Sequence, residues 1–183
     1  MRRWGSKAPW AALLTAVLLG IVIFGGSASR AEPPTGQAAT TTEEQELLEL
    51  LEKNQLVTAR RKVDAWLRTH PDSMVGHYVL GRVMHESEGN LPQAMRHLGK
   101  ALDIYEGQYS VHPRSPGAPW LFHRELLYAI QGVAQRLEEF DYQLEILDYH
   151  DLLYDPNLIG EHAWPLMRLG KFSEAREAAR QAA

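Results

Sequence analysis

The fold is decided by a short stretch near the C-terminus, Leu169-Gly170-Lys171-Phe172-Ser173-Glu174-Ala175. It is typical of one helix ending at a glycine in the left-handed conformation and a second helix packing back through Phe172 and Ala175. Weaker copies occur at 53–59 and 89–94, where Asn or Gly is followed two positions later by an apolar residue and then by an alanine. A local pattern that recurs in this way indicates a repeat protein.

The alanines of these copies and the equivalent Gln143 give the period. They stand at positions 59, 94, 143 and 175, spaced by 35, 49 and 32 residues. The long interval holds a stretch with two prolines and two glycines, residues 106–118, which we predict to be an irregular insertion. Apolar spacing predicts helices at about 43–53, 56–69, 73–88, from near 92 to the insertion, 119–138, 141–153, from 157 with Pro165 in its middle, and from 173 to the end.

Particular residues predict details of these helices. Thr42, followed by Glu43 and Glu44, is expected to cap the first helix. Gly81 in the middle of a helix would cost about 1 kcal/mol relative to alanine, so it indicates a close helix contact. The third copy is irregular, because no glycine precedes Phe140.

Helix pairs with small residues at these offsets resemble tetratricopeptide repeats. The last unit matches best, through Ala163, Gly170, Phe172, Ala175 and Ala182, and the second matches with one extra residue in its turn. The resemblance covers most of residues 41–183. It implies an all-α fold, a right-handed α-solenoid of about four antiparallel helix pairs.

The first residues have the pattern of an export signal. Arg2, Arg3 and Lys7 precede an apolar run at 10–24, and small residues favour cleavage after Ala31 or, as a second choice, after Ala28. The alternative is an uncleaved anchor in the inner membrane formed by residues 10–24, although this run is short for a bilayer span. We therefore expect a periplasmic or secreted protein with a signal peptide at 1–31, a linker at 32–42 and a repeat domain at 43–183.

Composition excludes several classes of function. The chain carries 19 basic and 23 acidic residues, a net charge of −4, and residues 32–183 carry 15 and 23, a net charge of −8. A domain this acidic lacks the basic footprint of a nucleic-acid binder. The absence of cysteine excludes disulfides and thiolate metal sites.

The sequence offers no catalytic constellation, so we expect no enzyme and no cofactor. The stretch beginning at His85 starts like a zinc-protease motif, but Gly89 stands where the second histidine is required. A metal-binding protein based on the eight histidines remains a further alternative. Another is that these repeats are the N-terminal region of a larger envelope protein, since the best-formed repeat is the last.

Proteins of the resembled family bind partners on a concave face lined by the first helix of each pair. Carried over to this chain, the resemblance implies a protein or peptide partner. The residues expected on this face include Leu48 and Leu51, and the candidate partner-binding residues are Tyr78, Arg82, His85, Glu125, Tyr128, Gln135, Trp164, Met167 and Arg168. The alternative for Tyr78 and Trp164 is a place in the core between repeats. The family's carboxylate clamp is absent, because its positions hold Tyr78, Arg82, Tyr128 and Gly132.

Overall fold

The computed structural model describes residues 41–109, 118–154 and 156–182, and within these ranges the chain is helical without a strand. This confirms the all-α prediction. The signal segment, nearly all of the predicted linker and the centre of the insertion lie outside the described residues. The elements are α1 Thr42–Glu52, α2 Leu56–Thr69, α3 Met74–Val83, a π-helical segment η2 Met84–Glu88, α4 Leu91–Gln108, α5 Trp120–Arg136, α6 Phe140–Leu153, a 3-10 segment η3 Pro156–His162, α7 Ala163–Arg168 and α8 Phe172–Gln181.

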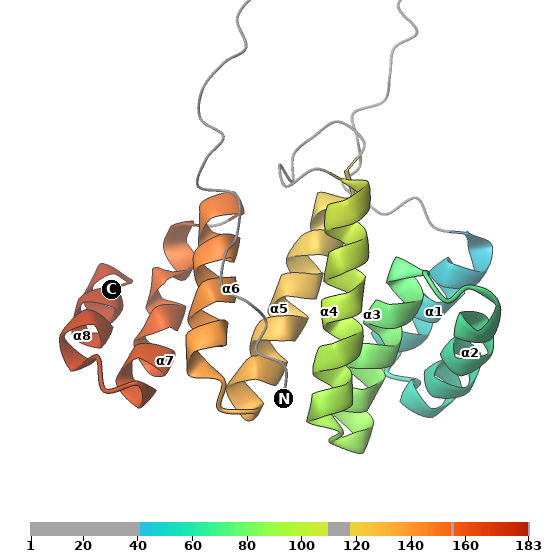
Figure 1. The fold of residues 1–183 in the computed structure, drawn as a ribbon, viewed down its shortest axis with the longest axis horizontal. Helices are drawn as coiled ribbons and strands as arrows, with labels where there is room; N and C mark the ends of the chain where they lie inside the picture. The colour runs from blue at the N-terminus through green and yellow to red at the C-terminus, as the bar shows by residue number, and fades with distance from the viewer. Residues whose placement is uncertain (1–40, 110–117, 155, 183) are drawn as a thin grey trace, which may run out of the picture. The chain divides into compact units, whose positions relative to one another are not determined.

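Each helix packs on the one that follows it in the chain, from α1 to α8, as Figure 1 shows. In addition, α1 contacts α3, and η3 contacts both α6 and α8. None of the described helices combines the length and the apolar character that a membrane crossing requires.

One turn geometry joins the two helices of every pair. A residue with positive φ follows the first helix, and the second helix begins two residues later. The four residues are Asn54 at 54°, Gly89 at 65°, Glu138 at 59° and Gly170 at 77°. The second helices accordingly begin at Leu56, Leu91, Phe140 and Phe172. The prediction of left-handed backbone at Gly170 is confirmed.

Three of these turns, at Asn54, Glu138 and Gly170, have the hydrogen bonds of a Schellman motif. At the last turn Gly170 N donates to Met167 O at 3.1 Å, and Lys171 N donates to Leu166 O at 2.9 Å. The turns at Asn54 and Glu138 make the same two bonds, with N–O distances of 2.8 to 3.2 Å. Two carbonyls near the end of the first helix are therefore satisfied by backbone amides of the turn.

The irregularity predicted for the third pair does not extend to its turn. Glu138 takes the left-handed conformation, which costs a residue with a side chain roughly 1–2 kcal/mol. The two Schellman bonds and the burial of Phe140, which is 8% exposed, favour the same turn. Tertiary packing thus holds Glu138 in the left-handed conformation that Gly170 adopts at the last turn.

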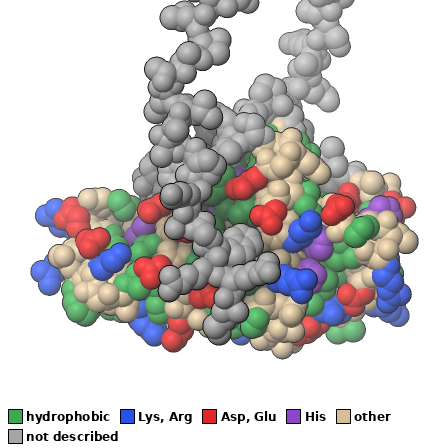
Figure 2. Space-filling view, in the orientation of Figure 1, with side chains coloured by type: hydrophobic (Ala, Val, Ile, Leu, Met, Phe, Trp, Pro, Cys, Tyr) green, Lys and Arg blue, Asp and Glu red, His purple; other side chains and the backbone are tan. Residues whose placement is uncertain are grey.

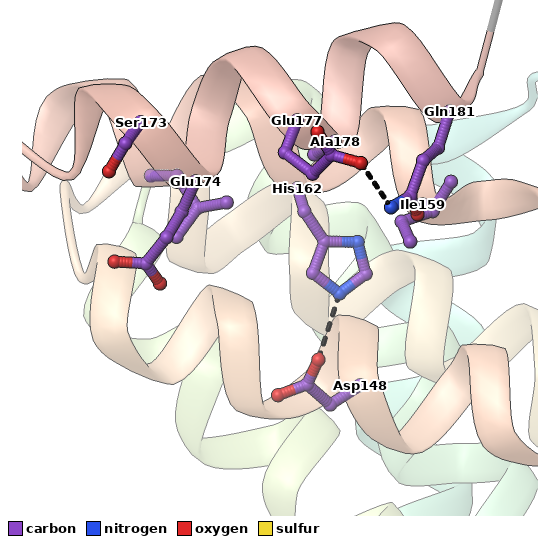
Figure 3. A pocket seen from close by; sticks show the side chains of 9 residues that line it. Asp148, Ile159, His162, Ser173, Glu174, Glu177, Ala178 and Gln181 are labelled. Atoms are coloured by element: carbon purple, nitrogen blue, oxygen red, sulfur yellow. Dashed lines mark hydrogen bonds and ion pairs between the residues drawn. The ribbon is translucent and has the colours of Figure 1, made fainter.

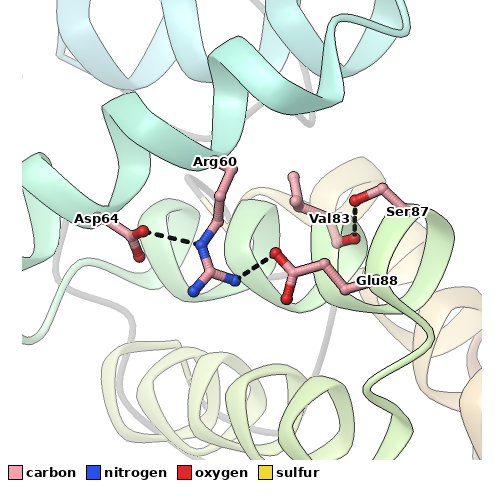
Figure 4. Close-up of polar contacts among 5 residues, drawn as sticks. All are labelled: Arg60, Asp64, Val83, Ser87 and Glu88. Carbon is pink, nitrogen blue, oxygen red and sulfur yellow. Dashed lines mark hydrogen bonds and ion pairs between the residues drawn. The ribbon is translucent and has the colours of Figure 1, made fainter.

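The extra residue of the second unit lies in the helix and not in its turn, contrary to the prediction. The last five residues of the predicted third helix form η2, and Asn90 N bonds to Met84 O at 3.1 Å. Polar contacts hold this segment against α2: Arg60 donates to Asp64 at 2.8 Å and to Glu88 at 2.7 Å (Figure 4). Ser87 Oγ donates to the carbonyl of Val83 at 2.8 Å. The insertion is absorbed as a wider helical turn.

The cap of the first helix differs from the sequence prediction. The cap of α1 is Thr41 and not Thr42, because Glu44 stands three residues after Thr41 and completes a capping box with it. The same carboxylate accepts from Ser73 Oγ, the cap of α3, at 2.5 Å. Glu44 thus joins the beginnings of two neighbouring helices.

The seventh helix is shorter than predicted. Residues 156–162 form η3, and α7 begins only at Ala163, so Pro165 lies in the first turn and not in mid-helix. A proline there costs no backbone hydrogen bond, since the first amides of a helix have no partner within it. Phe172 also differs from the prediction: it is 65% exposed, and only Ala175 of the expected contact pair is buried.

The core consists of two clusters. The larger runs from Leu47 in α1 to Ile146 in α6, and the smaller consists of Leu166, Ala175 and Ala178 with partly buried neighbours from α6, η3 and α7. The close contact predicted at Gly81 is confirmed: a Cβ there would lie 2.6 Å from Leu98 Cγ and 3.2 Å from the carbonyl oxygen of Ala94. The glycine lets α3 and α4 approach.

We therefore expect Gly81→Ala to lower the free energy of unfolding by about 1–3 kcal/mol, because the methyl group overpacks the α3–α4 contact. Gly99→Ala is the matched control. It also lies in a helix but has nothing within 4 Å of an added Cβ, so it should raise stability by up to about 1 kcal/mol. Urea unfolding of both variants decides; equal effects would contradict the close contact.

Candidate functional site

Tyr78, the first residue predicted to bind a partner, lies in the core and not on an open face. Tyr78 is 6% exposed, and its ring packs edge-to-face with the Phe122 ring of α5, with the ring centres 5.1 Å apart. Its hydroxyl accepts a hydrogen bond from Arg82 Nη1 at 2.7 Å, and burial raises its pKa. Tyr78 therefore joins α3 to α5, and Arg82 satisfies its polar end.

His85 also packs against α5. Its ring covers Gly132, where an added Cβ would lie 3.5 Å from His85 Cε1. Arg136 Nη1 donates to the backbone carbonyl of His85 at 3.0 Å. This second link between η2 and α5 was missed from the sequence, because nothing local connects residues 51 positions apart.

The three candidate residues on α5 are exposed. Glu125 and Gln135 are exposed, and the charge of Glu125 contributes to the raised pKa of Tyr78, so this carboxylate lies near α3. Tyr128 is 39% exposed, and its ring centre lies 4.5 Å from that of His150 in α6. The structure thus brings Tyr78, Arg82, His85 and Glu125 together where α3 and η2 meet α5.

The candidates on α7 form a separate group. Trp164 is 44% exposed and Met167 is 42% exposed. The Arg168 guanidinium lies 4.6 Å from the centre of the Phe140 ring and 5.5 Å from that of Trp164. Arg168 Nη2 also donates to Glu138 at 3.0 Å. Arg168 therefore holds α7 against the turn before α6.

Three of the nine candidates offer exposed apolar surface on first helices: Tyr128, Trp164 and Met167. Aromatic side chains are common anchors at protein interfaces. On the face in Figure 2, apolar side chains are interspersed with charges of both signs. The candidate surface is thus a set of exposed apolar residues on helices that are joined by polar side-chain contacts.

A histidine–tyrosine cluster lies buried between α4, α5 and α6. The His123 ring is fully buried and stacks on Tyr105 of α4, with ring centres 4.0 Å apart. From α6, Tyr149 meets it edge-on, and the Tyr154 hydroxyl lies 2.6 Å from His123 Nδ1. Burial, with a smaller effect from His150, lowers the pKa of His123 to about 4. Tyr105 and His123 are buried at its centre, Tyr149 and Tyr154 are partly buried around them, and the cluster packs α4, α5 and α6 together.

A second histidine pair joins α3 to α4. The Nδ1 atoms of His77 and His97 are 3.0 Å apart, and His77 Nε2 donates to the carbonyl of Pro71 at 2.9 Å. Burial, with a smaller effect from the charge of His77, lowers the pKa of His97 to about 4. Both rings are therefore neutral in the native state near pH 7.

The metal hypothesis finds no ligand set in the part of the chain that the structure describes. No three His, Asp or Glu side chains converge there in a way that could hold an ion. His77 pairs with His97, and His85 faces Gly132, so these two histidines do not meet at one point.

Comparison with known proteins does not place the chain in a family. No protein-family model matches the sequence, and a search of curated proteins returns no significant match.

His97 and His123, whose pKa values are lowered to about 4, predict acid sensitivity. At pH values between about 4, the folded-state pKa, and 6.5, the ordinary pKa of histidine, the unfolded chain binds more protons than the folded chain. The stability that these neutral histidines contribute is therefore fully present above pH 6.5 and is lost as the pH drops toward 4. His123 alone should account for about 3 kcal/mol, at 1.36 kcal/mol per pKa unit.

The measurement is urea unfolding of wild type, His123→Phe and Tyr105→Phe at pH 7, 6, 5 and 4. His123→Phe keeps a flat ring in the stack but cannot bind a proton, so its stability should depend less on pH. Tyr105→Phe retains His123 and should keep the wild-type slope, since burial raises the pKa of Tyr105 to about 12, outside this range. An unchanged slope in His123→Phe would contradict the assignment.

Proposed function

We propose that residues 41–182 form a scaffold of the tetratricopeptide type, a right-handed solenoid of four helix pairs that binds a protein or peptide partner and catalyses no reaction. The positive-φ residue that stands two positions before the second helix of all four pairs supports the repeat assignment. The family resemblance rests on the small residues that precede and follow these turns.

The observation that carries the binding proposal is the exposed apolar surface on the first helices of the third and fourth pairs. Tyr128, Trp164 and Met167 each leave about two fifths of their surface open to solvent. Tyr128 rests on His150 and Trp164 faces Arg168, so neither aromatic ring needs large reordering when it binds. Pre-ordered aromatic side chains bind at low entropic cost.

The members of the predicted set that contact a neighbouring helix have a supporting role in this proposal. Tyr78, Arg82 and His85 fix α3 against α5, and Arg168 fixes α7 against Glu138. These contacts set the spacing at which the exposed residues are presented. We also propose that residues 1–31 direct export, so that the partner is met in the cell envelope or outside the cell.

The partner test uses wild type, Tyr128→Ala, Trp164→Ala and Val57→Ala as bait for periplasmic and membrane fractions of the native cell. Loss of one interface anchor, about 2 kcal/mol, corresponds to about 30-fold weaker binding. We expect a protein captured by wild type to be lost with Tyr128→Ala and Trp164→Ala. Val57 is 85% exposed on α2, a second helix, so Val57→Ala should retain it.

Two results would contradict the proposal. The first is a captured protein that all three variants retain, because the first helices would then not be the binding surface. The second is recovery of the native protein only from the cytoplasmic fraction, which would remove the export step.

A further inference from the structure

A groove of about 470 Å³ lies between α6, η3 and α8 (Figure 3). Its apolar lining consists of Ile159, Leu166 and Ala178, which belong to the small core cluster or pack against it. The groove shares no residue with the partner-binding surface proposed above.

Small side chains let α8 lie close to η3 beside the groove. The end of α8 approaches η3 at Gly160, where an added Cβ would lie only 2.6 Å from Ala182 Cβ. Along α8 the groove is lined by Ser173, Glu174, Glu177, Ala178 and Gln181, which follow one another at helical spacing on one side of the helix. The packing of α8 by alanines leaves a space that larger apolar residues would have filled.

The polar lining of the groove is acidic. Asp148, Glu174 and Glu177 contribute three carboxylates, and none of the nine lining residues is a lysine or an arginine. Within the described residues Glu174 makes no ion pair, whereas Glu177 accepts from Arg180 at 2.7 Å and from Gln181 at 2.8 Å. Glu174 is therefore the carboxylate most available to a ligand.

His162 holds the third carboxylate in place. Its side chain is 8% exposed, and its Nε2 lies 2.9 Å from Asp148 Oδ1. The Asp148 side chain itself remains 77% exposed. Figure 3 shows the His162 ring in the groove, pointing toward Asp148 of α6. One oxygen of Asp148 is thus positioned by a buried ring while the carboxylate still faces solvent.

We propose that this groove binds a basic amphipathic segment of a partner protein. An apolar side chain of that segment would lie on Ile159, Leu166 and Ala178, and a lysine ammonium would lie between Glu174 and Asp148. A lysine side chain suits such a site, because its methylene chain packs on apolar surface while its charge stays at the solvent-exposed rim.

The charge of the groove selects against other ligands. A phosphate or carboxylate would meet three carboxylates, with no lysine or arginine among the lining residues to offset them. A neutral apolar ligand would remove water from the carboxylates without pairing them, which is unfavourable. A cationic amphipathic ligand covers the apolar floor of the groove and also forms ion pairs with the carboxylates at its rim.

The test measures binding of a labelled five-residue peptide, alternating lysine and leucine, to the full chain by fluorescence anisotropy. The comparison peptide replaces each lysine with glutamine. We expect saturable binding of the lysine peptide that weakens with added salt, and at least threefold weaker binding of the glutamine peptide. Glu174→Gln and Asp148→Asn should each weaken binding of the lysine peptide at least threefold.

Glu43→Gln is the matched control, because Glu43 is also an exposed acid in the first turn of a helix, α1. It should bind the lysine peptide as wild type does. Unchanged affinity in both groove variants, an equal loss in Glu43→Gln, or equal binding of the glutamine peptide would each overturn the proposal.

A measurement on the wild-type chain keeps the proposal testable if a variant fails to fold. In NMR titrations the lysine peptide should shift the amide signals of Ile159 and Ala178, and leave those of Leu47 and Val63 in α1 and α2 unchanged. Absence of shifts at Ile159 and Ala178 at saturating peptide would overturn the proposal. Because the groove and the first-helix surface share no residue, neither result bears on the first-helix proposal.

Discussion

Every helix pair of this domain depends on a backbone turn that reverses the chain within two residues. The positive φ at Asn54, Gly89, Glu138 and Gly170 lets the chain leave one helix and enter the next while backbone amides of the turn donate to carbonyls of the helix end. The residue five positions later, Ala59, Ala94, Gln143 or Ala175, is buried in every pair. The turn therefore fixes both the antiparallel direction and the part of the second helix that packs inward.

The side-chain links between pairs show where this regular plan is adapted. In the second pair the π segment η2 takes up one extra residue, and Arg60 and Arg136 hold it from α2 and α5. In the third pair Glu138 adopts the left-handed conformation and pairs with Arg168 of the fourth. Both adaptations use arginines that reach neighbouring helices, so the deviations are stabilised by tertiary contacts.

Much of the fold follows from local sequence. The two ends of α2, the left-handed Gly170 and the close contact at Gly81 were all predicted, because each depends on neighbouring residues or on the lack of a side chain. The conformation of Glu138, the π segment and the exposure of Phe172 were not predicted, because packing far along the chain decides them. Of the candidate residues, Tyr128, Trp164 and Met167 are exposed, but Tyr78 is buried against Phe122, 44 residues away.

The central structural claim is that the domain is a chain of helix pairs held by nearest-neighbour contacts, with the last pair resting on its own small cluster. Native-state hydrogen exchange tests it most directly. Amides of α8 should exchange through openings of lower free energy than amides of α3, α4 and α5, which share the larger cluster. Equal opening free energies for α8 and α4 would show one cooperative unit and contradict the claim.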